Sequence, residues 1–468
     1  MKHFFTTFFT LWVSLYTYGQ ADLNDFITGQ LSDKSVFLEI DYEAMLDSID
    51  ALNAALSSND TTESDETADW GVYTYLKASV VGEHAEDESG WSVALSSDGQ
   101  ILAIGAMKND DAGNNAGHVR VYQWDLANSE WLQRGVDIDG TSQGDGFGRS
   151  VALSADGSIL AVGANGNDSF ASNSGQTQVF KWDSGTWQQL GEDIYGEVAG
   201  DFSGFDVALS HDGETVAIGA PTNGVVANGS ARVFSWDEGG AEWLQVGDDL
   251  IGEGAGDQFG VSLALSADGT VLAVGASMND GTGSNAGHVR VYGLTSSNAW
   301  SQLGADLDGE MADDRSGYSV SLSSDGEKIA IGAVKNDDNG IRSGHVKVYE
   351  WDASSAAWNQ LGANIPGEAA YDWSGWSVAL AEDGERVAIS STYNDDNGTN
   401  AGHVRVYQWN GSSESWEQFG DDIDGEGLED ESGWCIDLSS EGDVLAIGSP
   451  GNDDNGTDSG HVRVMVAN

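Results

Sequence analysis

The sequence is poor in cysteine, proline and basic residues, and each shortage narrows the folds and partners that fit it. Its 468 residues include one cysteine, three prolines and 18 lysines and arginines. The single Cys435 excludes an internal disulfide framework. Because 77 acidic residues bring the formal charge to −59, nucleic acid and anionic membrane surfaces would be repelled, and neither is expected as a partner.

Long apolar runs are also missing, apart from one at the start of the chain. Lys2 and His3 precede an apolar stretch over 4–16, and small residues follow as far as Gly19, which predicts a secretory signal peptide over 1–19. No later run approaches the roughly 20 apolar residues that span a bilayer, so no transmembrane segment is expected in the mature chain. We expect a secreted, extracellular or cell-surface protein; an uncleaved signal anchor is the alternative.

Residues 20–68 lack the pattern that organises the rest of the chain. A heptad-like apolar seam predicts a helix over 38–56, formed by Leu38, Tyr42, Met45, Ile49, Leu52 and Leu56. This helix would either join copies of the protein weakly or dock on the following domain. The polar, acidic residues 57–68 predict a flexible linker.

What the sequence has in abundance is glycine and tryptophan, 63 and 17 residues, placed at a fixed period. Seven similar copies follow one another at intervals of 56 to 58 residues, beginning at Gly82, Gly140, Gly196, Gly252, Gly309, Gly367 and Gly425. In the sixth copy, alternating apolar residues predict strands over 376–380, 386–390, 403–409 and 416–420. Seven units of four antiparallel strands predict an all-β, seven-bladed β-propeller over 69–468.

The two ends of the repeat region fit a closed ring. The seventh copy ends after a third strand over 462–466, and the residues over 70–76, before the first copy, resemble the missing fourth strand. An N-terminal strand that completes the last blade would remove an exposed sheet edge.

The motif SGWSVALSSDGQILAIGA over 89–106 resembles the FG-GAP repeat of integrin α-subunit propellers and related secreted bacterial repeat proteins. The dipeptide FG stands at Phe147-Gly148 and Phe259-Gly260, and GAP is intact over 219–221. The resemblance implies a seven-bladed propeller with an extracellular adhesive or recognition role. Many members hold Ca²⁺ in the loop between strands one and two. Here Leu102 stands at the last carboxylate position, so that calcium site is not expected.

Acidic residues gather instead in the loop between strands two and three, which reads NDD in four copies. Carboxylate and carbonyl oxygens beside a flexible glycine are typical ligands of Ca²⁺, the one cofactor we consider. The candidate metal ligands are Asp110, Asp111, Asp337, Asp338, Asp395, Asp396, Asp453 and Asp454. The alternative is that these residues only stabilise turns by bonding to their own backbone.

The connection between blades, GExxxDxSG, should emerge on the same face as the NDD loop, because both follow the same alternation of strands. We therefore predict an acidic arc over neighbouring copies five, six, seven and one, with tryptophans beside it that could stack on sugars. The candidate ligand-binding residues are Asp87, Asp314, Asp372, Asp430, Trp91, Trp373, Trp376 and Trp434.

Three further columns of the repeat have structural interpretations. The histidines that begin strand three are expected to donate to a nearby carboxylate or carbonyl more often than to hold a metal: His118, His288, His345, His403 and His461. Basic residues two positions later should pair with acidic ones, and the tryptophans of strands three and four should pack blade on blade.

No catalytic set stands out, since Ser, His and Asp recur in many copies whereas an active site is a unique constellation. We therefore expect no enzyme. The leading hypothesis is a non-enzymatic recognition or adhesion protein that binds an extracellular protein or glycan through the acidic face, with Ca²⁺ assisting. The alternative is a lectin-like propeller that takes carbohydrate on its tryptophans.

Overall fold

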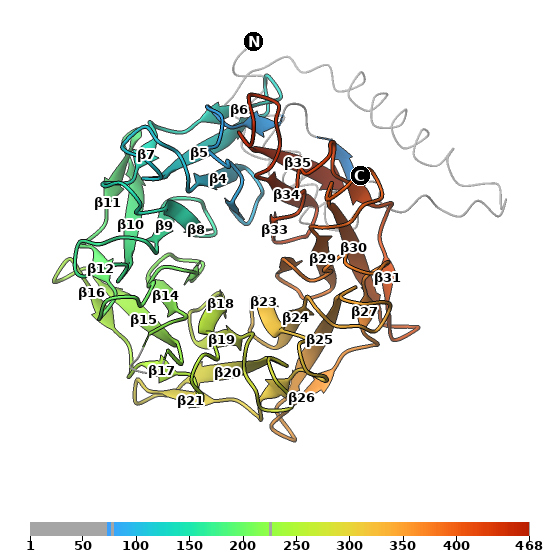
Figure 1. The fold of residues 1–468 in the computed structure, drawn as a ribbon. Coiled ribbons are helices and arrows are strands. Elements are labelled where there is room, and N and C mark those ends of the chain that lie inside the picture. The colour runs from blue at the N-terminus through green and yellow to red at the C-terminus, as the bar shows by residue number, and fades with distance from the viewer. Residues whose placement is uncertain (1–72, 76–78, 224–226, 468) are drawn as a thin grey trace, which may run out of the picture. The chain divides into compact units, whose positions relative to one another are not determined.

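The alternating sequence of each repeat forms one antiparallel sheet, and seven such sheets stand around a central axis (Figure 1). The computed structural model describes residues 73–75, 79–223 and 227–467. The signal peptide, helical seam and linker expected before residue 69 lie outside the described residues. The described part of the chain offers no helix with the length and apolar character needed to cross a bilayer.

The first blade shows how a repeat folds. From the centre outwards it contains β3 (Ser92–Leu95), β4 (Ile101–Ala106), β5 (His118–Asp125) and β6 (Glu130–Gln133). Every residue of β4 is buried, because sheets cover both of its faces, so its sequence is a continuous apolar run. A fifth strand, β7 (Ile138–Asp139), pairs with the start of β5, and the outer edge is thus divided between β6 and β7.

The next five blades repeat this order. Their strands are β8 (Phe147–Leu153), β9 (Ile159–Ala164), β10 (Gln176–Asp183), β11 (Thr186–Gln189) and β12 (Ile194–Tyr195); β13 (Val207–Leu209), β14 (Thr215–Ala220), β15 (Ser230–Asp237), β16 (Glu242–Gln245) and β17 (Leu250–Ile251); β18 (Phe259–Leu265), β19 (Val271–Ala276), β20 (His288–Leu294), β21 (Trp300–Gln302) and β22 (Leu307–Asp308); β23 (Ser316–Leu322), β24 (Lys328–Ala333), β25 (His345–Asp352), β26 (Ala357–Gln360) and β27 (Ile365–Pro366); and β28 (Val378–Leu380), β29 (Arg386–Ser391), β30 (His403–Asn410), β31 (Ser415–Gln418) and β32 (Ile423–Asp424). The prediction of four antiparallel strands per blade is confirmed, with the short fifth strand as an addition.

The seventh blade combines both ends of the described chain. It contains β33 (Cys435–Leu438), β34 (Val444–Ser449) and β35 (His461–Ala467). Along β35 lie β1 (Tyr73–Tyr75) and β2 (Val80–Val81), both antiparallel to it. The segment that precedes the first blade therefore runs beside the last one.

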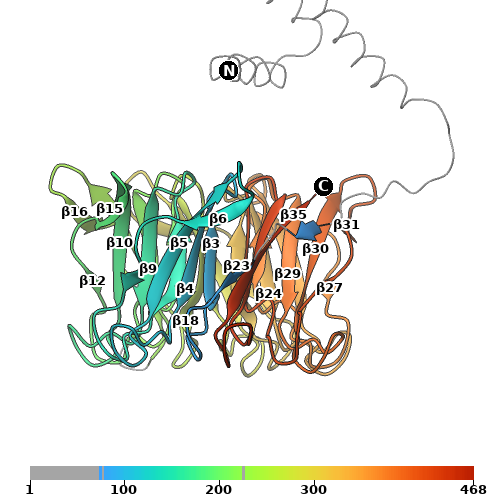
Figure 2. The same cartoon turned by 90° about the horizontal axis from the view of Figure 1, so that it is seen from above.

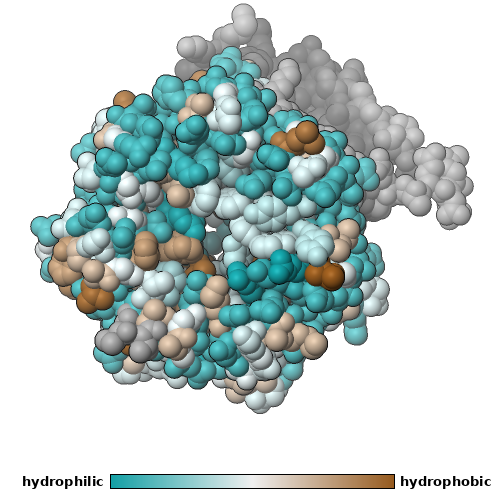
Figure 3. Space-filling view, viewed as in Figure 1, coloured by the Kyte–Doolittle hydropathy of each residue, from teal (hydrophilic) through white to brown (hydrophobic). Residues whose placement is uncertain are grey.

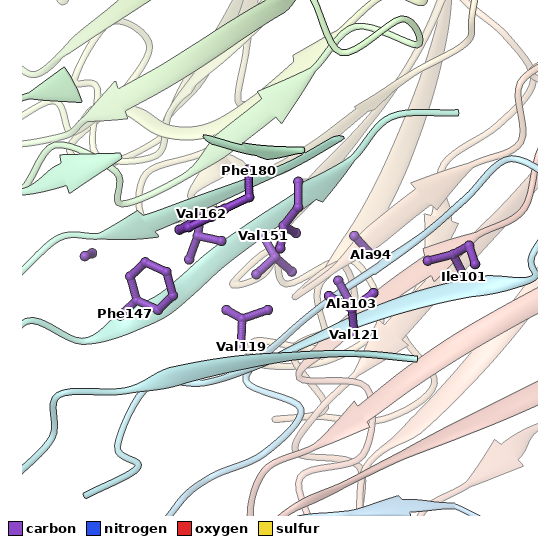
Figure 4. Close-up of a cluster of buried hydrophobic side chains, with 11 residues drawn as sticks. Ala94, Ile101, Ala103, Val119, Val121, Phe147, Val151, Val162 and Phe180 are labelled. Carbon is purple, nitrogen blue, oxygen red and sulfur yellow. The ribbon is translucent and has the colours of Figure 1, made fainter. Parts of the chain in front are cut away.

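Apolar side chains fill the space between neighbouring blades rather than one central core. Between the first two blades, Val119, Leu160 and Val162 are fully buried, and Phe147 and Phe180 pack edge to face at 6.2 Å between ring centroids (Figure 4). Burial of each such side chain contributes roughly 1.5–3 kcal/mol. Seven similar clusters hold the blades together.

The glycines that recur in the FG and GAP motifs of this chain meet at the junctions between blades. A Cβ on Gly105 of β4 would lie 2.2 Å from the carbonyl oxygen of Gly148 in the next blade, and one on Gly275 would lie 2.1 Å from that of Gly317. Only glycine permits this approach. The sixth blade departs from the rule, since Ser390 stands at this position beside Gly433.

Candidate functional site

Two loops of each repeat meet on one face of the propeller. In the first blade, buried Asn109 donates from Nδ2 to Asp87 Oδ2 (3.2 Å), and its Oδ1 accepts the backbone N–H of Asp111 (3.0 Å). Asn452 makes the same pair of bonds, to Asp430 at 3.2 Å and from Asp454 at 2.9 Å. The expectation that the NDD loops and the blade connections share one face is confirmed. Figure 2 shows the strands running between two loop-bearing faces.

The acidic residues of the blade connections are the inner part of this arrangement. Asp87, Asp314, Asp372 and Asp430 are only 2–4% exposed. Each accepts a backbone N–H from three residues earlier in its own loop, at 2.7–3.0 Å. Burial raises the pKa of Asp87 and Asp372. These carboxylates therefore stabilise the loops in the folded protein. That they also contact a ligand stays a prediction.

The two aspartates of each NDD loop differ in role. The first one closes the loop: Oδ1 of Asp110, Asp337, Asp395 and Asp453 accepts the backbone N–H five residues later, at 2.7–2.9 Å. In the last three copies the second one lies near the histidine that begins strand three, as Asp338 does at 2.9 Å from His345 Nδ1, whereas Asp111 is not part of the first-blade cluster. The turn interpretation thus describes the first aspartate, and metal binding by the second stays a prediction.

Among the described residues, five blades bring a histidine and two or three carboxylates within 4.8 Å of one another. Each histidine begins a strand that is labelled in Figure 1: β5, β20, β25, β30 or β35. The clusters are Glu83, His118 and Asp137; Glu253, His288 and Asp306; Glu310, Asp338 and His345; Glu368, Asp396, His403 and Asp422; and Glu426, Asp454 and His461. The histidines are 0–2% exposed. Burial lowers the pKa of His118 and His403 to about 4, so both imidazoles are neutral at neutral pH.

The expectation that these histidines donate to carboxylates holds for two of them. His345 bonds to Asp338 at 2.9 Å and His461 to Asp454 at 3.4 Å. His118 Nδ1 and both ring nitrogens of His403 have no hydrogen-bond partner among the described residues.

Basic residues two positions after the histidines pair with the glutamates of the blade connections, as expected. Lys347 Nζ lies 2.7 Å from Glu310 Oε1, and Arg405 Nη1 lies 3.5 Å from Glu368 Oε1. Arg405 also donates from Nη2 to the carbonyl oxygen of Pro366 at 2.9 Å. These bonds tie strand three to the connection that precedes its blade.

The first strands of all blades line a central cavity of about 780 Å³, which opens in the middle of the largely hydrophilic face in Figure 3. In each blade, the residue after the glycine of SG or FG lies in the wall of this cavity. The residues at this position in six blades form what we call the aromatic crescent. The crescent consists of Tyr318, Trp376, Trp434, Trp91, Arg149 and Phe205.

Contacts within the crescent are continuous. Trp376 lies 4.8 Å from both Tyr318 and Trp434, and Trp434 lies 4.7 Å from Trp91, measured between ring centroids. The guanidinium of Arg149 then lies 4.0 Å from the Phe205 ring centroid and 5.5 Å from that of Trp91. Such cation–π contacts are strongest where water is excluded.

Two carboxylates, Asp206 and Asp437, also stand on the channel strands. Asp206 Oδ2 accepts the backbone N–H of Leu263 (2.7 Å), and Asp437 Oδ2 accepts that of Leu95 (2.7 Å), each in the following blade. Burial raises the pKa of both to about 6. Burial also raises the pKa of the Cys435 thiol to about 12, so this cysteine is protonated at neutral pH.

The four predicted tryptophans are thus placed around the channel. Trp91, Trp376 and Trp434 belong to the crescent, whereas Trp373 extends it outwards, 5.9 Å from Trp376 and 5.2 Å from Tyr393. Sequence reasoning missed Arg149, Phe205, Tyr318 and the two channel aspartates. Comparison of this one column through all seven copies would have found the first three.

The tryptophan of strand four bonds to the preceding blade, as expected for packing of blade on blade. Trp187 lies 5.3 Å from Trp182 of its own blade, with the rings tilted, and donates from Nε1 to the carbonyl oxygen of Arg134 in the preceding blade at 2.9 Å. The same bond recurs in the four blades that follow, from Trp243, Trp300, Trp358 and Trp416.

Comparison with known proteins agrees with this architecture. The family model described as FG-GAP repeat matches residues 79–122, 136–180, 252–292, 306–349 and 366–407, which lie in blades one, two, four, five and six. A search of curated proteins gave no match. Blades three and seven fall outside the matched residues and have the same strand order. The described residues therefore form a seven-bladed β-propeller, and five of its blades match the FG-GAP repeat.

Proposed function

We propose that this protein is a secreted or cell-surface, non-enzymatic recognition or adhesion protein that binds an extracellular protein or glycan through its acidic loop face. The observation that carries the proposal is the paired loop arrangement. Buried Asn–Asp bonds fix the NDD loops, so their exposed carboxylates are held in place before a partner arrives. Preorganised groups lose little conformational entropy on binding, which favours affinity. FG-GAP propellers are typical of extracellular recognition proteins, which supports the same conclusion.

The test compares charge on the two faces. Asp111, Asp396 and Asp454 are replaced together by Asn, and binding of the purified protein to a panel of immobilised extracellular-matrix proteins and glycans is measured. Loss of binding is expected in this variant. The matched control replaces Asp183, Asp237 and Asp352 by Asn in the same way. These residues lie in hairpins of the opposite face, so this control protein should bind like the wild type. Equal binding by all three proteins would contradict the use of the acidic face.

Calcium assistance is the finer part of the proposal. The second aspartates of the NDD loops offer carboxylate oxygens beside backbone carbonyls, which suits Ca²⁺. Calorimetric titration with Ca²⁺ should give a saturable signal that the triple Asp→Asn variant loses. If chelation changes neither surface binding nor the melting temperature, calcium has no part in the function.

A lectin-like function is the second candidate, and the aromatic crescent favours it. Trp91, Trp376 and Trp434 form a continuous row of tilted rings in the wall of the cavity, and aromatic faces bind the apolar sides of sugar rings. Glycan-array binding that vanishes in Trp376→Ala and Trp434→Ala, but not in Trp182→Ala on the third strand of its blade, would support this function over the first. Binding that survives both channel substitutions would exclude it.

A further inference from the structure

The cluster at the start of β30 differs from its counterparts in the other blades. His403 is 0% exposed, and its Nδ1 points at the carboxylate of Glu368, 3.8 Å from Oε2. Neither ring nitrogen has a hydrogen-bond partner among the described residues. A buried polar atom without a partner costs about 1–3 kcal/mol, so an uncompensated imidazole here requires an explanation.

Three carboxylates surround this imidazole, more than in any other of the five clusters. Ligand atoms of Glu368, Asp396, His403 and Asp422 all lie within 4.8 Å of one another. Arg405 offsets one of the three negative charges through Glu368. These groups alone therefore keep an excess of two negative charges around a neutral imidazole, which a divalent cation would balance.

The fifth blade shows the same site in a form that needs no ion. Asn364 occupies the position of Asp422 and donates to Asp338 Oδ2 at 3.0 Å, while His345 Nδ1 lies 2.9 Å from that same oxygen. Lys347 pairs with Glu310 at 2.7 Å. Every group of that cluster has a partner within the protein. In the sixth blade Glu368 pairs with Arg405 and Asp422 accepts from Gln418 Nε2 at 2.6 Å, but His403 has no hydrogen-bond partner among the described residues.

We propose that Glu368, Asp396, His403 and Asp422 form a binding site for a divalent transition metal of the Zn²⁺ class. One imidazole with carboxylates is a ligand set that suits Zn²⁺, whereas Ca²⁺ takes oxygen ligands alone. The site lies between the blade connection with Glu368, the NDD loop, strand three and the turn before β32, and a bound ion would hold these four segments together. This inference does not depend on the proposed recognition function. It shares Asp396 with the calcium proposal and assigns a different ion to that residue, so the single variants of His403 and Asp422 test it separately.

The test is equilibrium dialysis of the full chain against Zn²⁺, with Co²⁺ as a spectroscopic probe. Wild-type protein should bind one Zn²⁺ ion with higher affinity than any further Zn²⁺ ion, and excess Ca²⁺ should not displace this ion. Co²⁺ should give visible absorption bands characteristic of nitrogen and oxygen ligands. Asp422→Asn, which copies the fifth blade and leaves the buried histidine in place, should weaken the tight site by at least about 100-fold, because even loss of an outer-shell partner costs 10–100-fold.

Two further variants make the result decisive. His403→Gln should abolish both the tight Zn²⁺ site and the Co²⁺ bands, whereas His345→Gln in the fifth blade should leave them unchanged. Equal Zn²⁺ affinity in wild type, Asp422→Asn and His403→Gln would overturn the proposal. Displacement of Zn²⁺ by Ca²⁺ would also overturn it, since it would indicate a nonspecific oxygen site. A failure here would leave the calcium and glycan tests of the recognition face unaffected.

Discussion

At the scale of single residues, the repeat assigns different tasks to side chains that look alike in sequence. The paired aspartates of NDD are an example: Asp337 closes its loop on the Arg342 N–H, whereas Asp338 bonds to His345. Both are aspartates of one short acidic run, so residue type alone does not separate them. The difference arises from strand three, which brings the histidine back beside only one of the two.

Gly275 gives a prediction about junction packing. Its replacement by Ala would place Cβ 2.1 Å from the Gly317 carbonyl oxygen, so the neighbouring blade must shift. We expect a loss of about 1–3 kcal/mol in unfolding free energy, as for other overpacked sites, measured by urea denaturation. Gly239→Ala, in a surface hairpin where the nearest atom would lie 3.4 Å from Cβ, should change stability little. An unchanged midpoint for Gly275→Ala would contradict the close approach.

Buried histidines give a prediction about pH. The folded pKa of His403 is about 4, below the usual 6.5, so the unfolded chain binds a proton more readily than the folded one in this range. The stability associated with the neutral His403 imidazole is fully present above pH 6.5. It is lost as the pH falls towards 4, and the free energy of unfolding decreases by roughly 3 kcal/mol at most. Denaturation with a chelator present should show His403→Gln losing part of this acid sensitivity. His84→Gln, at an exposed site, is the control and should keep the acid sensitivity of the wild type.

At the scale of strands and loops, periodicity carried most of the fold prediction. Alternating apolar residues and regularly spaced turns identify the four main strands of each blade, because a blade repeats the same burial pattern at each copy. The two-residue strands such as Ile138–Asp139 were not predicted, since so short a segment has no alternation. The aromatic crescent was missed in part because its members are some 57 residues apart and become neighbours only when the ring forms.

The strands along β35 give a prediction about ring closure. Removal of residues 20–81 would strip β1 and β2 from the last blade and expose the edge of β35 to other chains. We expect a lower melting temperature and concentration-dependent aggregation, measured by calorimetry and light scattering. Removal of residues 20–68 alone is the control, and it should melt like the full chain. If both truncated proteins behave alike, closure by the N-terminal strand is wrong.

At the scale of the whole molecule, charge is the dominant feature. A formal charge of −59 resists compaction through self-repulsion, which salt screens. The melting temperature should therefore rise as NaCl is increased from low to physiological concentration. Calorimetry in NaCl, repeated with a tetraalkylammonium chloride to separate screening from specific cation binding, measures this. A melting temperature that falls with added salt would indicate that attractive ion pairs outweigh the repulsion.

The aromatic crescent makes the channel asymmetric about the propeller axis, which the similarity of the seven repeats does not suggest. The seven similar blades approximate sevenfold rotational symmetry. The residues that follow the glycine of SG or FG and face the channel nevertheless read Trp, Arg, Phe, Val, Tyr, Trp, Trp from the first blade to the seventh. Val261 interrupts it on one side, opposite the stacked tryptophans. A molecule entering the channel would meet flat rings on one wall and an aliphatic gap on the other. The symmetry of the scaffold is therefore broken where a guest would enter, so only one orientation of that guest can be preferred.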